Sequence, residues 1–247
     1  TITPSDLHFE RHHGGAAVVD PQKWKLVIHG MVERQLTFDL EDLKRFPSVT
    51  RVHFIECAGN GRNAYRTPKP DMTLSLLLRE AGVKPKATWL LAEGGDAAVL
   101  SRSIPVTKAL DDALLVWGQN GEPLRVQNGY PVRLLLPGWE GNACVKWLRR
   151  LELIDQPNMS RDETSKYTDP LPGGKARQFS FEMDAKSVIT SPVAPARLSR
   201  AGWWPVRGLA WSGRGRVTRV EVSTDGGKAW ADAEKAANQL LQNMAGN

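Results

Sequence analysis

The chain has 247 residues, of which 41% are hydrophobic and 24% charged, and its net charge is +6 at neutral pH. This composition excludes a disordered chain and is typical of one or two globular domains with a sizeable core. The basic residues are scattered, so the charge fits an anionic substrate or an acidic partner and weakens the case for nucleic acid, while no stretch reaches the roughly 18 apolar residues of a membrane span.

The first 155 residues alternate between predicted strands and short helices. Apolar runs predict strands at residues 24–30, 51–56, 88–92, 113–116, 129–138 and 144–154. Helical patterns, two of them stopped by Pro47 and Gly82, predict short helices at residues 40–45, 74–81 and 107–110. Residues 63–73 contain two prolines and are predicted to form a loop, and Asn120-Gly121 is a strong turn signal.

The second part of the chain reads differently. Residues 155–185 are polar with little regular pattern, which indicates a connecting segment. A strand at 206–211 and a hairpin around the turn at 224–227 then predict a second β unit, and residues 233–244 predict a helix. We therefore expect an α+β fold, with a mixed α/β domain over 1–155, a connection over 156–185 and an immunoglobulin-like β-sandwich over 186–247. The sandwich is expected to be incomplete, because such a domain normally needs about 100 residues.

The predicted site is organised around the stretch from Val52 to Arg62. An apolar strand ends at Cys57, and Gly59 and Gly61 allow the backbone to approach a ligand closely. Arg62 would favour the thiolate form of a nearby thiol, which is the form that binds a soft metal. The alternative interpretation is a buried structural cysteine beside a turn.

A second polar cluster lies near the start of the chain, at His8-Phe9-Glu10-Arg11-His12-His13, followed by Gly14-Gly15. Such a cluster could bind an anion or a metal, or it could be a solvated entry loop. A zinc site made of His12, His13, His53 and Cys57 is a further alternative, although their spacing matches no standard zinc pattern.

Several motifs together resemble the sulfite oxidase family of molybdenum enzymes. They are Glu56-Cys-Ala-Gly-Asn60, Phe9-Glu-Arg-His-His13, Gly129-Tyr-Pro-Val-Arg133, Pro137-Gly138, Val145-Lys-Trp-Leu148, Ala210-Trp-Ser-Gly213 and Val220-Glu-Val-Ser-Thr-Asp-Gly-Gly227. Thr164-Ser-Lys-Tyr-Thr-Asp169 and Asp184-Ala-Lys-Ser-Val-Ile-Thr-Ser191 are similar to one bacterial branch, the molybdenum subunit of sulfane (sulfite) dehydrogenase. The resemblance implies a molybdopterin-binding domain followed by a dimerisation domain.

The resemblance also implies roles for individual residues. Cys57 would be the protein ligand of molybdenum, Arg11 would bind the substrate oxyanion, and Arg216, or less closely Arg214, would be lent to the substrate pocket by the second domain. Trp117 stands where the family usually has an active-site tyrosine, and its N–H can donate but cannot ionise. The molybdopterin cofactor would be held by Phe9, Glu10, Arg11, His12, His13, Asp96, Asn128, Arg133, Cys144, Val145 and Lys146.

The implied reaction is oxidation of sulfite or of thiosulfate-derived sulfane sulfur, with electrons passed to a c-type cytochrome. The two cysteines form no Cys-x-x-Cys-His site, so no haem is expected in this chain. The resemblance further implies a homodimer, or a heterotetramer with the cytochrome, and a periplasmic location; no signal segment is recognisable, and the start at Thr1 indicates that an earlier segment was removed or left out. Besides Trp117, the sequence departs from the family in a shorter segment between Met72 and Leu74 and in the short second domain. A catalytically inactive relative that acts as a binding or assembly subunit is therefore the alternative function.

Overall fold

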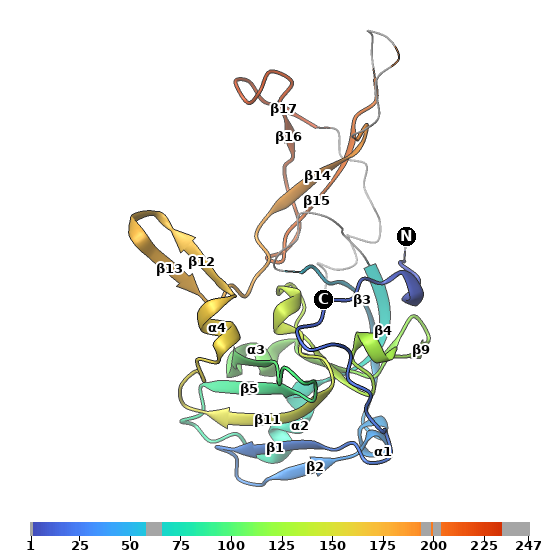
Figure 1. Ribbon diagram of the computed structural model, residues 1–247, viewed down its shortest axis with the longest axis vertical. Helices are drawn as coiled ribbons and strands as arrows, with labels where there is room; N and C mark the ends of the chain where they lie inside the picture. The colour runs from blue at the N-terminus through green and yellow to red at the C-terminus, as the bar shows by residue number, and fades with distance from the viewer. Residues whose placement is uncertain (1, 58–65, 194–198, 200–203, 234–247) are drawn as a thin grey trace. The chain divides into compact units, whose positions relative to one another are not determined.

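The computed structural model of the chain describes residues 2–57, 66–193, 199 and 204–233, and for residues 66–71 it describes the backbone (Figure 1). Two compact units divide the chain, Thr1–Phe181 and Glu182–Asn247. The predicted helix at 233–244 lies outside the described residues except for Ala233, and so do Gly59, Gly61 and Arg62 of the stretch from Val52 to Arg62.

A five-stranded sheet forms one part of the first unit, in the order β2-β1-β11-β5-β6 (Figure 1). Strand β1 pairs with β11 in parallel and with β2 in antiparallel fashion, while β5 pairs antiparallel with both β11 and β6. The bounds are β1 Leu26–Gly30, β2 Leu36–Phe38, β5 Trp89–Gly94, β6 Ser101–Pro105 and β11 Leu148–Ile154. Every second residue of β1 is buried, which is the period that makes an apolar run a strand facing a core.

Three short helices connect this sheet to strands of a second sheet described below: α1 Leu40–Lys44, α2 Leu74–Ala81 and α3 Val106–Asp111. All three correspond to predicted helices. A capping box between Asp39 and Asp42 starts α1, and Gly82, with a left-handed φ of 69°, ends α2. Local signals of this kind can be recognised from sequence, because they involve residues within one turn of each other.

A four-stranded sheet, in the order β10-β7-β4-β3, contains a correction to the sequence prediction. Its strands are β3 Val49–Phe54, β4 Arg66–Thr73, β7 Leu114–Val116 and β10 Arg133–Leu135. Residues 63–73 were expected to form a loop, but 66–73 are strand β4, which pairs with β3 throughout and with β7 only at Asp71–Thr73. Pro68 and Pro70 lie two residues apart in the part paired on one side only. Their missing N–H groups therefore fall on the same unpaired edge, where a strand tolerates proline.

Residues 155–185 also hold more regular structure than the polar composition indicated. They form helix α4 Arg161–Ser165 and a hairpin of β12 Thr168–Leu171 and β13 Lys175–Gln178, joined by the 3-10 turn Pro172–Gly174. The prediction of a segment without pattern was wrong here, because α4 depends on a carboxylate, Glu163, that is fully buried against β6. Another short hairpin, β8 Gly118–Gln119 and β9 Glu122–Pro123, confirms the turn at Asn120-Gly121, whose φ angles of 54° and 83° are those of a primed turn.

The described part of the second unit consists of two antiparallel pairs. Strand β14 Lys186–Ser191 pairs with β15 Arg207–Trp211, and β16 Glu221–Val222 pairs with β17 Ala231–Asp232. The strand at 206–211 and the hairpin around 224–227 are thereby confirmed. Antiparallel pairing is also what an immunoglobulin-like sandwich uses.

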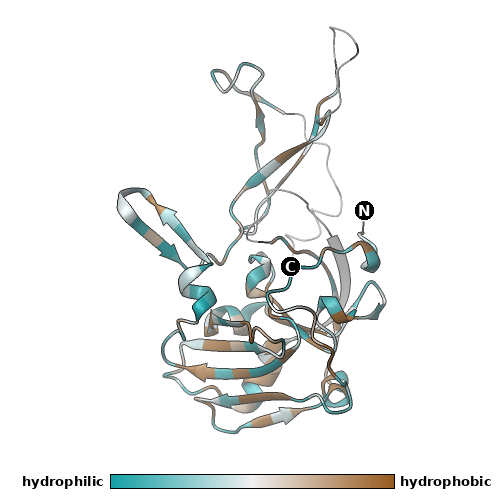
Figure 2. Cartoon of the chain, in the orientation of Figure 1, coloured by the Kyte–Doolittle hydropathy of each residue, from teal (hydrophilic) through white to brown (hydrophobic). Residues whose placement is uncertain are grey.

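The core of the first unit joins residues of both sheets and of α2. Leu26, Leu78, Leu90, Leu134 and Leu151 are almost completely buried in it. Figure 2 shows apolar residues along the strands of this unit, whereas α4 is hydrophilic. No described helix is long and apolar enough to cross a membrane.

Candidate functional site

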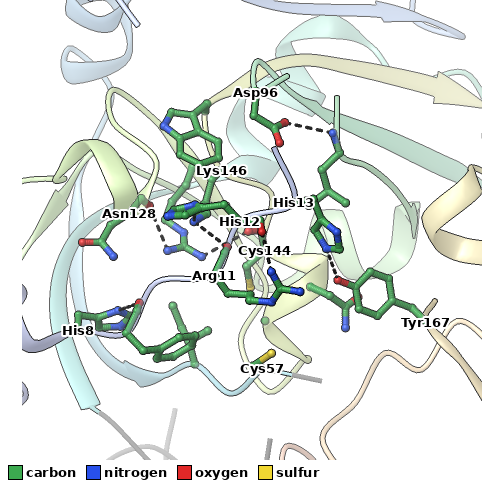
Figure 3. A pocket seen from close by; sticks show the side chains of 17 residues that line it. His8, Arg11, His12, His13, Cys57, Asp96, Asn128, Cys144, Lys146 and Tyr167 are labelled. Atoms are coloured by element: carbon green, nitrogen blue, oxygen red, sulfur yellow. Dashed lines mark hydrogen bonds between the residues drawn. The ribbon is translucent and has the colours of Figure 1, made fainter. Parts of the chain in front are cut away.

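One cavity in the first unit gathers side chains from segments that are far apart in sequence (Figure 3). The contributing segments are the N-terminal stretch after the 3-10 turn η1 Ser5–Leu7, the residues just after β3, the loop after β5, the turn η2 Val126–Asn128, β10, the turn η3 Gly141–Ala143 with the residues up to Trp147, and Tyr167 after α4. The predicted site residues that line it are Phe9, Arg11, His12, His13, Cys57, Asp96, Asn128, Arg133, Cys144 and Lys146. The sequence prediction missed His8, Ile55, Leu100, Gly141, Asn142, Trp147 and Tyr167.

Cys57 lines the cavity three residues after the end of β3. It is a free, half-buried thiol, and the two residues before it, Ile55 and Glu56, are buried. The N–H of Gly141 donates to the carbonyl oxygen of Glu56 at 2.6 Å. A Cβ at position 141 would come within 2.7 Å of that oxygen, so glycine is required for this contact. The contact anchors the backbone immediately before the thiol.

The N-terminal stretch is tied to the cavity by Lys146. The Nζ of Lys146 donates to the carbonyl oxygens of Arg11 and Gln127, at 3.1 and 2.8 Å, and lies 2.8 Å from Nδ1 of His12. His12 also contacts the carboxylate of Glu10 through Nε2, at 2.9 Å. The Arg11 side chain is exposed and donates to the carbonyl oxygen of His12, so most of its guanidinium is open to a ligand.

Lys146 has an unusual protonation equilibrium. Burial, followed by the nearby Arg133 guanidinium, lowers its pKa from 10.5 to about 7, while Glu10 and Asp96 act in the opposite direction. At neutral pH its charge is therefore sensitive to whatever anion enters the cavity.

We expect this equilibrium to make anion binding depend on pH. Sulfate affinity of the cofactor-free protein should fall as the pH rises between about 6 and 8, because Lys146 is protonated below its folded pKa and neutral above it. Titration calorimetry at constant ionic strength measures this slope. The Lys146→Met variant should have a flatter slope, by roughly threefold in affinity over that range. Lys86→Met, at an exposed position, is the matched control. Identical slopes in the parent and in Lys146→Met would contradict the assignment.

Arg133 on β10 lines another part of the cavity and holds the backbone around it. Its guanidinium is buried and donates to the carbonyl oxygens of Asn128 and Cys144, at 3.2 and 3.3 Å. Gly129, with a φ of 108°, lets the chain turn here, since a Cβ would lie 2.9 Å from that of Lys146. The buried Oδ1 atoms of Asn128 and Asn142 receive no hydrogen bond from the described residues. Buried oxygens without a donor normally have a ligand or water as partner.

Tyr167 lines the cavity although the sequence assigned it no site role. Its Oη lies 2.8 Å from Nε2 of His13, and the guanidinium carbon of Arg102 lies 4.8 Å from the centre of its ring. Burial raises the pKa of the Tyr167 phenol. The only sequence signal was its place in the branch motif that ends at Asp169.

Three predicted residues of the first unit do not line the cavity, and Arg216 and its alternative Arg214 belong to the second unit. Glu10 does not line the cavity but pairs with His12, and Val145 is fully buried in the core. Trp117 does not line it either and packs, partly buried, against the hydrophobic core. Arg216 is an exposed residue of the second unit, as is Arg214, which pairs with Glu182 at 3.2 Å and Asp184 at 3.1 Å.

The donor set fits an anionic cofactor that carries its own metal. Arg11, Arg133 and Lys146 face a single lining carboxylate, Asp96, beside the free thiol of Cys57. Guanidinium and ammonium groups suit phosphate and other oxyanions, and a thiolate suits a soft metal. The structure offers no ligand set for the zinc alternative, because the described residues contain no group of three or more His, Cys, Asp or Glu side chains able to hold a metal.

Comparisons with known proteins are consistent with an anionic, metal-carrying cofactor in this cavity. Residues 13–162 match the model of the oxidoreductase molybdopterin binding domain, and residues 177–245 match the Mo-co oxidoreductase dimerisation domain. The chain is 32% identical to the mitochondrial sulfite oxidase of Drosophila melanogaster over 96% of its length, and 31% identical to nitrate reductase [NADH] 2 of Phaseolus vulgaris over 93%. It covers only 48% and 31% of those two proteins, so it spans about half the length of its curated relatives or less.

A solved structure is also similar. The crystal structure of the sulfane dehydrogenase SoxCD from Paracoccus pantotrophus matches with a TM-score of 0.88 and 48% identity, covering 96% of this chain and 66% of that one. Membership of one family accounts for both domain matches, for the cavity and for the α+β fold. The chain belongs to the sulfite oxidase family of molybdopterin-binding oxidoreductases.

Proposed function

We propose that this chain is the molybdenum-binding part of an oxidoreductase that oxidises sulfite or sulfane sulfur and passes the electrons to a c-type cytochrome. The observation that carries the proposal is the meeting of the Cys57 thiol and the open Arg11 guanidinium in one cavity lined by further cations. A thiolate for the metal and an arginine for the substrate are the two groups that such a reaction requires of the protein.

The names of the relatives support a small oxyanion or a sulfur compound as substrate. The similar structure is named a sulfane dehydrogenase, and the curated relatives include sulfite oxidases and nitrate reductases. Sulfite and nitrate are both compact oxyanions that an arginine fork can bind through two parallel hydrogen bonds. Sulfur chemistry is favoured over nitrate because the identity to the sulfane dehydrogenase, 48%, is well above the 31% to the nitrate reductase.

The proposal gives the polar residues of the cavity three tasks: binding the metal, holding the cofactor and binding the substrate. Cys57 would ligate molybdenum, while Arg133, Lys146, Asn128 and Asp96 would hold the pterin and its phosphate. The bound cofactor would supply two-electron oxygen-atom transfer. Arg11 would orient the substrate so that its sulfur faces the metal side of the cavity, and the surrounding cations would stabilise its negative charge.

The electrons would leave to a separate protein. The only cysteines, Cys57 and Cys144, lie far apart in sequence, so this chain has no Cys-x-x-Cys-His motif for a c-type haem of its own. The match of residues 177–245 to a dimerisation domain supports a homodimer, or a heterotetramer with the cytochrome. A periplasmic location is part of the same proposal.

Steady-state turnover of the molybdenum-loaded protein tests the function. We expect one molybdenum per chain, and reduction of a c-type cytochrome by sulfite or thiosulfate that is faster than any oxidation of reduced cytochrome by nitrate. Running sulfite and thiosulfate separately, with and without candidate partner proteins, decides between the two sulfur substrates. A molybdenum-loaded protein that turns over neither would favour the inactive binding subunit instead.

A further inference from the structure

The turn η3 places a buried amide side chain, that of Asn142, in the lining of the cavity. Asn142 is only 8% exposed, and the oxygen Oδ1 of its side chain is shielded from solvent. Its neighbour Gly141 donates its N–H to the carbonyl oxygen of Glu56. The amide therefore follows directly, along the chain, the bond that anchors the backbone before Cys57.

A carboxylate fixes which way this amide is turned. One polar atom of the Asn142 side chain lies 3.0 Å from Oε2 of Glu140, and a carboxylate can only accept, so that atom is the nitrogen Nδ2. The other atom is then Oδ1, which receives no hydrogen bond from the residues that the structure describes. Asn142 thus uses its donor on the protein and leaves its acceptor for another group.

A buried acceptor needs a donor, and the lining of the cavity decides where that donor comes from. Leaving such an oxygen unpaired costs stability, so it normally has a partner in the functional protein. Gln119 on β8 is also buried without partners in the described part of the chain, but it does not line the cavity. Asn128 combines both features, as Asn142 does, and it is already assigned to the cofactor.

The chemistry of the possible ligands narrows the choice further. Fully ionised sulfite and sulfate present only acceptor oxygens, which match the cations Arg11, Arg133 and Lys146. An amide oxygen offers these anions nothing, since it can only accept. The pterin ring system of the cofactor is different, because its ring N–H and amino groups are hydrogen-bond donors.

We propose that Asn142 is a cofactor-binding residue, whose Oδ1 accepts a hydrogen bond from an N–H group of the pterin. Glu140 is a positioning residue, because it holds Nδ2 and so leaves Oδ1 as the atom offered to the cofactor. This inference deepens the proposed function and rests on its cofactor, not on its substrate. It adds a neutral acceptor to a cavity whose cations serve the negatively charged groups.

Release of the pterin from the molybdenum-loaded protein tests this contact. Asn142→Leu keeps nearly the same side-chain shape and removes the acceptor, so the pterin should leave about tenfold faster after dilution. Fluorescence of the released and oxidised pterin measures the rate. The dissociation constant of sulfate, an unreactive anion, should change by less than about twofold, because the cations that bind it are untouched.

Exchanging the two groups of the pair provides the rescue variant. Glu140→Gln combined with Asn142→Asp moves the amide to position 140 and the carboxylate to position 142, so the pair still bonds and an acceptor oxygen is still left over. Pterin release should return to within about threefold of the parent rate. Glu140→Gln alone keeps an acceptor for Nδ2 and should resemble the parent.

Gln119→Leu is the matched control. It removes another buried amide without a partner among the described residues, but one outside the cavity lining, so any effect of general destabilisation on pterin release appears there. Its release rate should equal that of the parent. Thermal melts and the initial molybdenum content check that each variant is folded and loaded.

The outcomes separate this inference from the proposed function. Unchanged pterin release in a folded Asn142→Leu variant, or equal acceleration in Gln119→Leu, would overturn the role of Asn142. A folded rescue variant that releases pterin as fast as Asn142→Leu would also overturn it, since packing and not an acceptor would then hold the cofactor. If the loaded parent oxidises no sulfur compound, the proposed function fails, whereas the release rates still decide whether Asn142 binds the pterin.

Discussion

Replacing Cys57 with serine is expected to abolish turnover while the protein stays folded. The substitution exchanges a soft thiolate for a hydroxyl that stays protonated at neutral pH, and that hydroxyl is a poor ligand for molybdenum. Substituting outer partners of a metal ligand already costs about 10–100-fold, so losing the ligand itself should cost more than about 100-fold in kcat. Because the thiol is half-buried and makes no disulfide, stability should change by less than about 1 kcal/mol.

The second cysteine provides the matched comparison. Cys144 also lines the cavity, but it holds Arg133 through its carbonyl oxygen, and its sulfur accepts from the N–H of Leu136 at 3.4 Å. Serine keeps the carbonyl and an acceptor oxygen, so Cys144→Ser should lower turnover by less than about tenfold. Turnover and molybdenum content measured in parallel distinguish loss of metal from loss of chemistry. Retained turnover in Cys57→Ser would refute the ligand role.

The parts of the fold that the sequence predicts are those with local causes. The capping box at Asp39, the left-handed Gly82 and the turn at Asn120-Gly121 each involve neighbouring residues. Strand β4 could not be recognised in this way. Its prolines normally argue against a strand, and they are tolerated because β7 pairs only with the far end of β4. That fact depends on the arrangement of three strands and leaves no local signal.

The same distinction applies to the cavity. Motifs indicated Cys57, Arg11 and Lys146, because each stands in a recognisable run of residues. Asn142 stands in no quoted motif, and Tyr167 stands in one to which no site role was assigned. Both reach the cavity through contacts with distant segments: η3 through the bond from Gly141 to Glu56, and Tyr167 through His13, 154 positions earlier in the chain. Trp117 shows the converse case, because its motif position pointed to the site while its side chain packs against the core.

Replacing Glu163 with alanine should produce a large loss of stability in the first unit. This carboxylate is completely buried and accepts hydrogen bonds from the N–H of Ser103, from Ser103 Oγ at 3.1 Å and from the N–H of Ser160 at 3.1 Å. Alanine leaves these donors unpaired in the interior and opens a small cavity. Unpaired buried donors cost about 1–3 kcal/mol each, so the free energy of unfolding should fall by about 3 kcal/mol. The melting temperature should then fall by roughly 6–12 °C.

Two further variants define what the Glu163 experiment measures. Glu163→Gln keeps one acceptor oxygen and should lose about half as much stability, whereas Glu33→Ala, at an exposed position, should change the melting temperature by less than about 2 °C. Hydrogen exchange at the amides of Ser103 and Ser160 should accelerate in Glu163→Ala before the unit unfolds, because these N–H groups lose their acceptor. An unchanged melting temperature would contradict the assignment. Since Glu163 anchors α4 to β6, and the cavity-lining Tyr167 stands two residues after the end of α4, the variant should also weaken sulfate binding at the cavity. A buried carboxylate outside the cavity would thus set the position of the phenol inside it.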